Sequence, residues 1–421
     1  MIPPSDQHTP VSESPRAGVV ESAQPGVDNL PLWWKIAGTL LLVGLLLSGA
    51  TSSYYYHTFL FSTFFAFSMA CSLILLIRVG PSAQEVVSVL ALTCALATLD
   101  YAVLQFRLSI SGLISLLGLS SLMVLGLRMI WTRKQRRILH YAFWPALLMA
   151  LSAGATSWTL DRTTLWHPKT LDLYLYSFDC SLGIQISFFV GIWFVRWIWL
   201  ARLTEWIYGG VALPLGLVYA MQLKHQQRAR TSIIAFLVAG PVGALFYNFI
   251  PATGPIHVFP NFPSIPISTA LVARLALEPI AVSGPRNAIP SLHTAWVLLA
   301  FWNSRHAPFW ARAIAFLFLA FTVFATLGMG EHYFVDLVVA FPFALMIQAI
   351  ASIRWSGFQP QWRLPFISGL VGTLAWLALL RFATRLMWVS PALPWTLIGA
   401  TIAASLFLYL KLQHSVEAVA A

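Results

Sequence analysis

Two short segments of the chain carry the residues that could do chemistry. The first, PSLHTA, contains Ser291 and His293, and the second, EHYFVD, contains His332 and Asp336. His332 and Asp336 are four residues apart, so on a helix they share one face, one turn apart. A carboxylate in that position accepts a hydrogen bond from one imidazole nitrogen and leaves the other as a base or nucleophile.

The residues around the first segment supply what a phosphate site needs. His293 opens a different apolar stretch and is suited to protonate a leaving group. Ser291 and the free N–H groups at the start of both predicted helices favour an anion between them. Arg286, five residues before Ser291, adds a planar donor fork that matches phosphate. Together these residues predict phosphoryl transfer.

The composition requires that most of the surface faces lipid. Of the 421 residues, 58% are hydrophobic and only 9% are charged, whereas a soluble domain carries about 25% charged residues. The net charge of +11 does not indicate nucleic-acid binding, because the basic residues lie in short loops between apolar runs. The three cysteines are too far apart to predict a metal site or a disulfide framework.

The apolar runs predict an all-α, polytopic membrane bundle of about twelve transmembrane helices, because runs of about 20 residues span a bilayer. The predicted spans are 33–50, 58–77, 84–106, 109–131, 138–158, 207–223, 232–250, 289–304, 309–328, 332–353, 365–383 and 392–411. The predicted domains are a disordered cytoplasmic tail (1–31), N-terminal helices for scaffolding or lipid access (32–158), a catalytic core (159–355) and C-terminal helices (356–421).

The strongest positive charge lies in the loops TRKQRR (132–137) and KHQQRAR (224–230), which are therefore predicted to be cytoplasmic. An even number of crossings must separate them, yet three apolar stretches do: 138–158, 184–204 and 207–223. Charge mixed with aromatic residues favours an interfacial position for residues 160–204. The alternative is that 184–204 crosses and 207–223 does not.

Counting the spans onward from this point gives the orientation of the candidate site. His293, His332 and Asp336 all fall at the extracytoplasmic end of their spans, although the positive-inside rule takes no account of them. The same count leaves both termini in the cytoplasm. We therefore predict an integral protein of the plasma (inner) membrane with its active site on the extracytoplasmic face.

The two motifs resemble the second and third signatures of the type 2 phosphatidic acid phosphatase superfamily. PSLHTAW is similar to the second, and HYFVD is similar to the third, which has histidine, three residues and aspartate. Leucine before the first histidine and tyrosine after the second resemble the inositol phosphorylceramide synthase branch. FYNFIPATGP (246–255) also resembles the segment that precedes the second signature there. The resemblance covers roughly residues 160–353.

The resemblance implies a six-helix catalytic core and a role for each site residue. His332 would be the nucleophile that forms a phosphohistidine, Asp336 would orient it, His293 would protonate the departing oxygen, and Ser291 would hold the phosphate. The family uses no metal and no organic cofactor. The implied partners are membrane lipids: a phospholipid or lipid phosphate as donor, and a sphingolipid or water as acceptor.

The chain also departs from the family pattern. The phosphatase form of the third signature has an arginine six residues before the histidine, where this chain has Thr326. The first, lysine- and arginine-containing signature has no clear copy. Arg286 is a candidate substitute, with Lys169 or Arg162 as helpers. These differences favour the synthase-like branch over a plain phosphatase.

Two further polar residues, Asn248 and His257, lie beside the predicted site in sequence and are candidates for contacts with a lipid headgroup. Asp100, in contrast, is better explained by a hydrogen bond to a neighbouring helix than by a relay. The main alternative function is a lipid or solute transporter or flippase that uses the same histidines and aspartate. A transporter of this kind is expected to show inverted repeats, and the sequence shows no convincing repeat. A lipid-phosphate-dependent glycosyltransferase would usually have a larger external domain than 251–288 provides.

Overall fold

The computed structural model describes residues 62–99, 101–102, 109–132, 135–223, 225–264, 267–353 and 360–418. All of these residues belong to one compact unit, Leu45–Ala421. The predicted tail, the predicted span 33–50 and Asp100 lie outside the described residues.

The described chain is almost entirely helical, which confirms the all-α prediction. The N-terminal helices are α3 (Thr63–Arg78), α4 (Ala83–Leu99), α5 (Ile110–Trp131) and α6 (Arg136–Trp166). The central helices are α7 (Asp172–Ser181), α8 (Ile186–Arg196), α9 (Ile198–Gly209), α10 (Ala212–Gln222), α11 (Gln226–Phe246), α12 (Pro255–Val258) and α13 (Thr269–Val272). The remaining helices are α14 (Leu292–Asn303), α15 (Phe309–Gly328), α16 (Phe334–Ala351), α17 (Pro360–Ala378) and α18 (Ala392–Ala418), with short 3-10 or π segments at 304–306, 379–383 and 384–389.

Seven helices in the described residues are long and apolar enough to cross a membrane. The number rises to eight if the bent pair α7–α8 forms one span, and three shorter apolar helices, α3, α4 and α10, fall below this length. These helices indicate an integral membrane protein, while the predicted count of about twelve is not confirmed. Helix α6 continues through the domain boundary that we predicted between residues 158 and 159.

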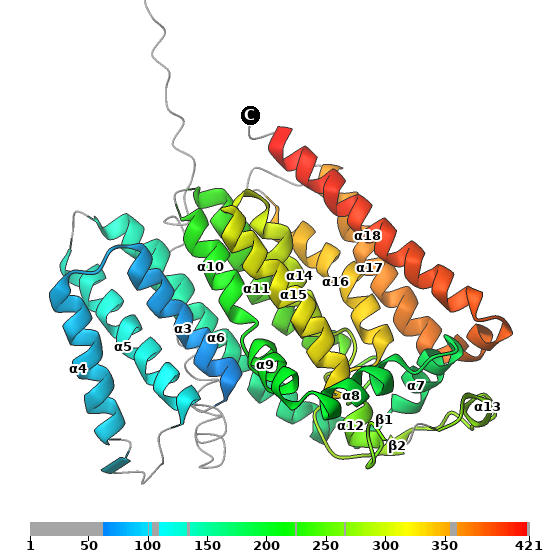
Figure 1. The fold of residues 1–421 in the computed structure, drawn as a ribbon. Helices are drawn as coiled ribbons and strands as arrows, with labels where there is room; N and C mark the ends of the chain where they lie inside the picture. The colour runs from blue at the N-terminus through cyan, green and yellow to red at the C-terminus, as the bar shows by residue number, and fades with distance from the viewer. Residues whose placement is uncertain are drawn as a thin grey trace, which may run out of the picture. The chain divides into compact units, whose positions relative to one another are not determined.

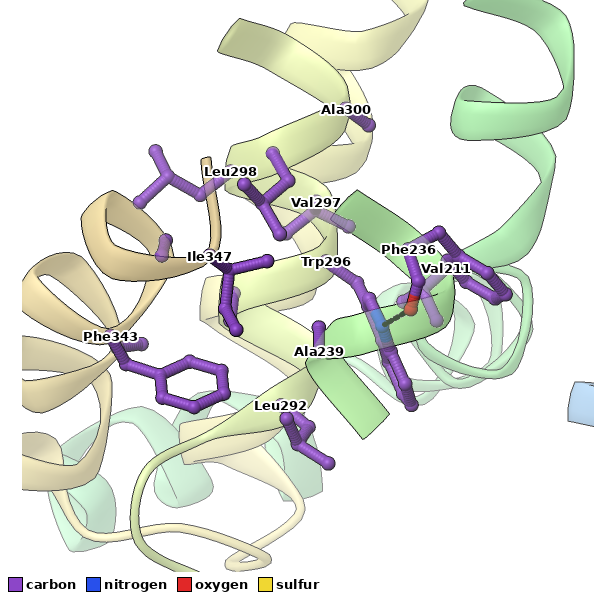
Figure 2. Close-up of a cluster of buried hydrophobic side chains, with 14 of the residues drawn as sticks. Val211, Phe236, Ala239, Leu292, Trp296, Val297, Leu298, Ala300, Phe343 and Ile347 are labelled. Carbon is purple, nitrogen blue, oxygen red and sulfur yellow. Dashed lines mark hydrogen bonds between the residues drawn. The ribbon is translucent and has the colours of Figure 1, made fainter. Parts of the chain in front are cut away.

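Helices α14 and α16 form the centre of the packing, together with α10, α11 and α15. Most residues of α14 and α16 are buried, as expected for helices that are apolar on all sides. Figure 2 shows part of this core, where Trp296 of α14 packs beside Phe236 of α11 and donates a hydrogen bond to its carbonyl at 3.3 Å. Phe343 and Ile347 of α16 face the same cluster.

The far ends of α14 and α16 are joined by a partly buried amide pair. Asn303 Nδ2 donates to Gln348 Oε1 at 2.8 Å, and Gln348 Nε2 donates back to Asn303 Oδ1 at 3.3 Å. Gln222 of α10 adds a bond of 2.6 Å to the Asn303 carbonyl. Because buried amides are costly when unpaired, this reciprocal pair fixes the register of the two helices.

The segment after α6 stays at one end of the long helices. Helices α7 and α8 meet at an angle of 92°, and Figure 1 shows α7, α8 and α12 near the end from which α14 and α16 begin. Helix α10 then leads back towards the loop KHQQRAR. This path fits the interpretation in which 160–204 is interfacial, and the choice of crossing segment stays a prediction.

The only strands among the described residues form a two-stranded antiparallel sheet of β1 (Lys169–Thr170) and β2 (Ile280–Ala281). Lys169 pairs with Ala281, and Thr170 pairs with Ile280. The sheet joins the long connection between α11 and α14 to the segment that precedes α7. It therefore sets where the residues just before Ser291 enter the site.

Candidate active site

His332 is buried in the turn between α15 and α16, and its ring has a defined tautomer. Its Nδ1 lies 2.9 Å from the carbonyl oxygen of Ala288 and 3.4 Å from Oδ2 of Asp336. Since a carbonyl only accepts, Nδ1 carries the proton of the neutral ring and Nε2 keeps its lone pair. Nε2 lies 3.3 Å from Oγ of Ser291. The nitrogen left for nucleophilic chemistry is thus the one that faces the first motif.

His293 lies in the first turn of α14, beside His332. The two ring centroids are 6.4 Å apart. The His293 ring stacks on Tyr208 of α9 at 3.9 Å and meets the edges of Phe64 and Trp296. These aromatic contacts hold the imidazole in place without using its nitrogens. The structure thus brings the two histidines of the separate motifs close together.

Ser291 is the N-cap of α14 and joins it to α16. Its Oγ accepts from Thr294 N at 3.4 Å and donates to Thr294 Oγ1 at 3.0 Å, while its own N–H donates to the carbonyl of Asp336 at 3.2 Å. Within the described part of the chain, no acceptor lies against the N–H groups of Leu292 and His293. The first turn of α14 therefore offers donors to an anion.

The N-terminus of α16, in contrast, is already occupied, which corrects the expectation that both helices would bind the anion. Asp336 Oδ2 accepts from the N–H of Tyr333 at 2.8 Å. The carboxylate of Asp179, on α7, accepts from Phe334 N at 2.6 Å and Val335 N at 3.1 Å. Carboxylates satisfy these N–H groups and offset the positive end of the helix dipole. Asp336 thus caps its own helix as well as facing His332.

The structure also corrects the assignment of Arg286 as a phosphate ligand. The side chain is buried, and it donates four hydrogen bonds to backbone carbonyls. The acceptors are the carbonyls of His167 at 2.8 Å, Pro168 at 3.3 Å and Val282 at 2.9 Å, together with that of Gly284. Sequence alone could not show that this guanidinium would be surrounded by carbonyls. Arg286 fastens the segment before β1 to the segment after β2.

Arg286→Met is expected to lower the free energy of unfolding by about 2–4 kcal/mol, because it leaves several buried carbonyls without a donor. Arg286→Lys keeps a charged donor but cannot reproduce the planar fork, so its free energy of unfolding should fall somewhat less. Denaturant-dependent unfolding in detergent measures both. A phosphate ligand would give the opposite result, with unchanged stability and a raised KM in Arg286→Lys.

Two other predicted residues lie near the site without reaching the histidines. Lys169 is exposed in β1, and Asn248 follows α11, with its Oδ1 2.8 Å from Nε2 of His167. Among the described residues, no hydrogen bond joins either one to His293 or His332. A role for them in substrate binding stays a prediction, as it does for Arg162, whose guanidinium lies 5.4 Å from the centre of the Trp158 ring.

His257 is half-buried in α12 and forms an ion pair with the residue before His332. Its Nε2 lies 3.9 Å from Oε2 of Glu331. The nearby carboxylate of Glu331 is the main cause that raises the pKa of His257, and the charge of Asp172 adds to it, while partial burial and Arg286 oppose the shift. His257 is thus placed beside the site as predicted, and its contact with a substrate stays a prediction.

The ion pair predicts a pH-dependent contribution to stability. Because the folded-state pKa of His257 is raised, the contribution is complete below its ordinary pKa of about 6.5 and is lost as the pH rises through the folded-state value. For a partly exposed pair we expect about 0.2–1 kcal/mol. Glu331→Gln should therefore be less stable than wild type at about pH 5.5 and equally stable at high pH. Equal destabilisation at both pH values would contradict this.

Comparison of the chain with known protein families gives one match. Residues 173–350 match the model of the PAP2 superfamily. This region contains both motifs, α7 and α8, and it agrees with the resemblance expected for roughly residues 160–353. No curated protein and no solved structure is significantly similar to the chain. The superfamily match indicates a phosphatase or phosphotransferase, and it carries nothing specific to the inositol phosphorylceramide synthase branch.

Sequence reasoning missed two residues that contact the site. It predicted an interfacial position for residues 160–204, which include Asp179, but not that Asp179 caps α16, 155 residues further along the chain. It assigned no role to Tyr208, which stacks on His293. A buried aspartate and a tyrosine among interfacial aromatic residues give no local signal of such contacts. Only the bend between α7 and α8 and the position of α9 bring them to the site.

Proposed function

We propose that the protein is a membrane-embedded lipid phosphatase or phosphotransferase that works through a phosphohistidine on Nε2 of His332. One observation carries the proposal. The Ala288 carbonyl holds the proton on Nδ1 at 2.9 Å, so the unprotonated Nε2 faces Ser291, with the ring of His293 beside it.

The geometry supports a two-step reaction. In the first step Nε2 of His332 attacks phosphorus, the bond from phosphorus to the leaving oxygen breaks, and a protonated His293 gives that oxygen its proton. Ser291 and the open N–H groups of α14 bind the phosphate oxygens as their charge develops. In the second step water or a hydroxyl group attacks phosphorus, His293 takes its proton, and Nε2 is released.

The finer proposal is transfer of a phospho-headgroup between lipids, in the manner of an inositolphosphotransferase, with the site on the extracytoplasmic face. It is supported by the segment 246–255, which resembles that branch, and by Thr326, which stands where the phosphatase signature has arginine. Thr326 is buried and donates to the carbonyl of Val323 at 2.8 Å. It therefore does not replace the missing cation.

The test is to trap the adduct. The purified protein is incubated briefly with phosphorus-labelled lipids, namely phosphatidic acid and phosphatidylinositol, with and without a ceramide acceptor. We expect protein-bound label that survives base and is lost in acid, as a phosphorus–nitrogen bond requires. The label should be absent in His332→Ala and present in His414→Ala, a control at an exposed position in α18. Full turnover by His332→Ala would overturn the proposal.

A further inference from the structure

Helix α7 carries two buried aspartates, and neither contacts the ring of His332. Asp172 and Asp179 are seven residues apart, so they lie on the same side of the helix, two turns apart. Both side chains are almost completely buried. Buried carboxylates are retained only where hydrogen bonds satisfy them, and here most of the donors are backbone N–H groups, either directly after His332 or in a loop that packs on the residues before it.

Asp179 holds the chain that follows His332. Its two carboxylate oxygens accept from the N–H groups of Phe334 and Val335, at 2.6 and 3.1 Å. These are the first N–H groups of α16, which have no partner inside the helix. A carboxylate at a helix N-terminus stabilises the helix because it satisfies these groups and interacts favourably with the helix dipole. Asp179 therefore fixes where α16 begins, two residues after His332.

Asp172 holds the chain that precedes His332 through one intermediate loop. Its carboxylate accepts from the N–H groups of Thr253 and Gly254, at 3.1 and 2.9 Å. Gly254 packs directly on the turn of Glu331, because a Cβ at Gly254 would lie 2.3 Å from the Glu331 carbonyl oxygen. Ile256 N also donates to the carbonyl of Gly330 at 2.9 Å. Asp172 thereby holds the loop that contains Thr253 and Gly254 in contact with the residues just before His332.

Helix α8 adds a third contact, made to His332 itself. Oγ of Ser187 donates to the backbone carbonyl of His332 at 3.0 Å. The bend of 92° between α7 and α8 places this serine and the two aspartates around the same turn. We call the segment 172–196 the α7–α8 elbow. Its three side chains hold the turn before, at and after His332.

We propose that the α7–α8 elbow positions His332, with Asp179 as the main positioning residue and Ser187 as the second. The inference rests on the proposed function, because it assigns a role in setting the attack geometry of Nε2. Without Asp179, the first turn of α16 loses two hydrogen bonds, and the Asp336 carboxylate and the His332 ring lose a fixed support. A displacement of about 1 Å at a nucleophile costs on the order of 100-fold in rate.

The test compares Asp179→Ala, Asp179→Asn and Ser187→Ala with a matched control, Ser109→Ala. Ser109 caps α5, where its Oγ accepts from Gly112 N at 3.0 Å, so its loss removes a helix cap outside the site. We expect kcat to fall about 10–100-fold in Asp179→Ala, with KM within about 3-fold of wild type. Asp179→Asn keeps one acceptor oxygen, so its kcat should fall less. The kcat of Ser187→Ala should fall several-fold. Ser109→Ala should lose thermal stability and keep kcat.

A second readout is the imidazole ¹⁵N spectrum of His332, assigned by its loss in His332→Asn. Wild type should show the Nδ1–H tautomer, and Asp179→Ala should show a mixture of tautomers. Equal kcat in Asp179→Ala and Ser109→Ala, or an unchanged His332 spectrum, would overturn the inference. If Asp179→Ala does not fold, Asp179→Asn and Ser187→Ala decide by the same two criteria. Failure of the wild type to form an adduct would remove the proposed function, whereas the spectrum still tests the elbow.

Discussion

His332→Asn is expected to reduce turnover of a labelled lipid phosphate by about 10⁴-fold or more, the size of effect seen when a covalent nucleophile is removed. The asparagine amide can still donate to the carbonyl of Ala288, as Nδ1 does in the wild type at 2.9 Å. It has no atom at the position of Nε2. The variant therefore separates loss of the nucleophile from loss of the hydrogen bond that orients it.

The measurements are initial rates and thermal unfolding in the same detergent. His332→Asn should unfold within a few degrees of wild type. His332→Ala should be less stable, because the Ala288 carbonyl loses its donor. His332→Gln places a side-chain nitrogen or oxygen near Nε2 without basicity, so it should be equally inactive. Turnover by His332→Asn above a few per cent of the wild-type rate would contradict the nucleophile assignment.

His293→Gln is expected to reduce turnover by about 10²–10⁴-fold for substrates with an alkoxide leaving group, because general acid catalysis typically contributes this much. A nitrophenyl leaving group departs without a proton. The same variant should therefore lose far less of its turnover rate with a nitrophenyl phosphate. The comparison of the two substrates in one variant is independent of the amount of folded protein. Equal losses with both substrates would assign His293 to binding or packing instead.

The control for His293→Gln is Tyr208→Phe. The tyrosine ring stacks on His293 at 3.9 Å, and phenylalanine keeps that contact. Tyr208→Phe should retain most of the wild-type rate with both substrates. Tyr208→Ala should lose activity with the alkyl substrate in particular, since the imidazole then loses the surface that holds it.

The placement of the two histidines at one end of the helices could be predicted, because charge in the loops and the length of apolar runs decide the direction of each helix. The spacing of His332 and Asp336 also predicted their contact, observed at 3.4 Å. The histidine lies in the turn before α16 rather than on the helix. The contact therefore depends on the cap of the helix, and not on helical periodicity alone.

The errors concern the residues that surround these groups. Arg286 was expected to bind phosphate because guanidinium groups suit it, but four carbonyls surround its side chain. The start of α16 was expected to be open, but Asp179 reaches it from α7. Both outcomes depend on contacts between segments far apart in the chain. Sequence periodicity carries information about faces of one helix and none about which distant carboxylate will cap it.

Helices α14 and α16 are joined at both of their ends. At one end Ser291 N donates to the Asp336 carbonyl at 3.2 Å, and at the other Asn303 and Gln348 exchange hydrogen bonds. Two helices joined at both ends resist a change in the angle between them. We therefore expect the distance between the two imidazoles to stay nearly constant through the catalytic cycle. We therefore expect a lipid headgroup to enter by displacement of the surrounding connections, such as residues 267–288. Gating and chemistry would thus belong to different parts of the chain.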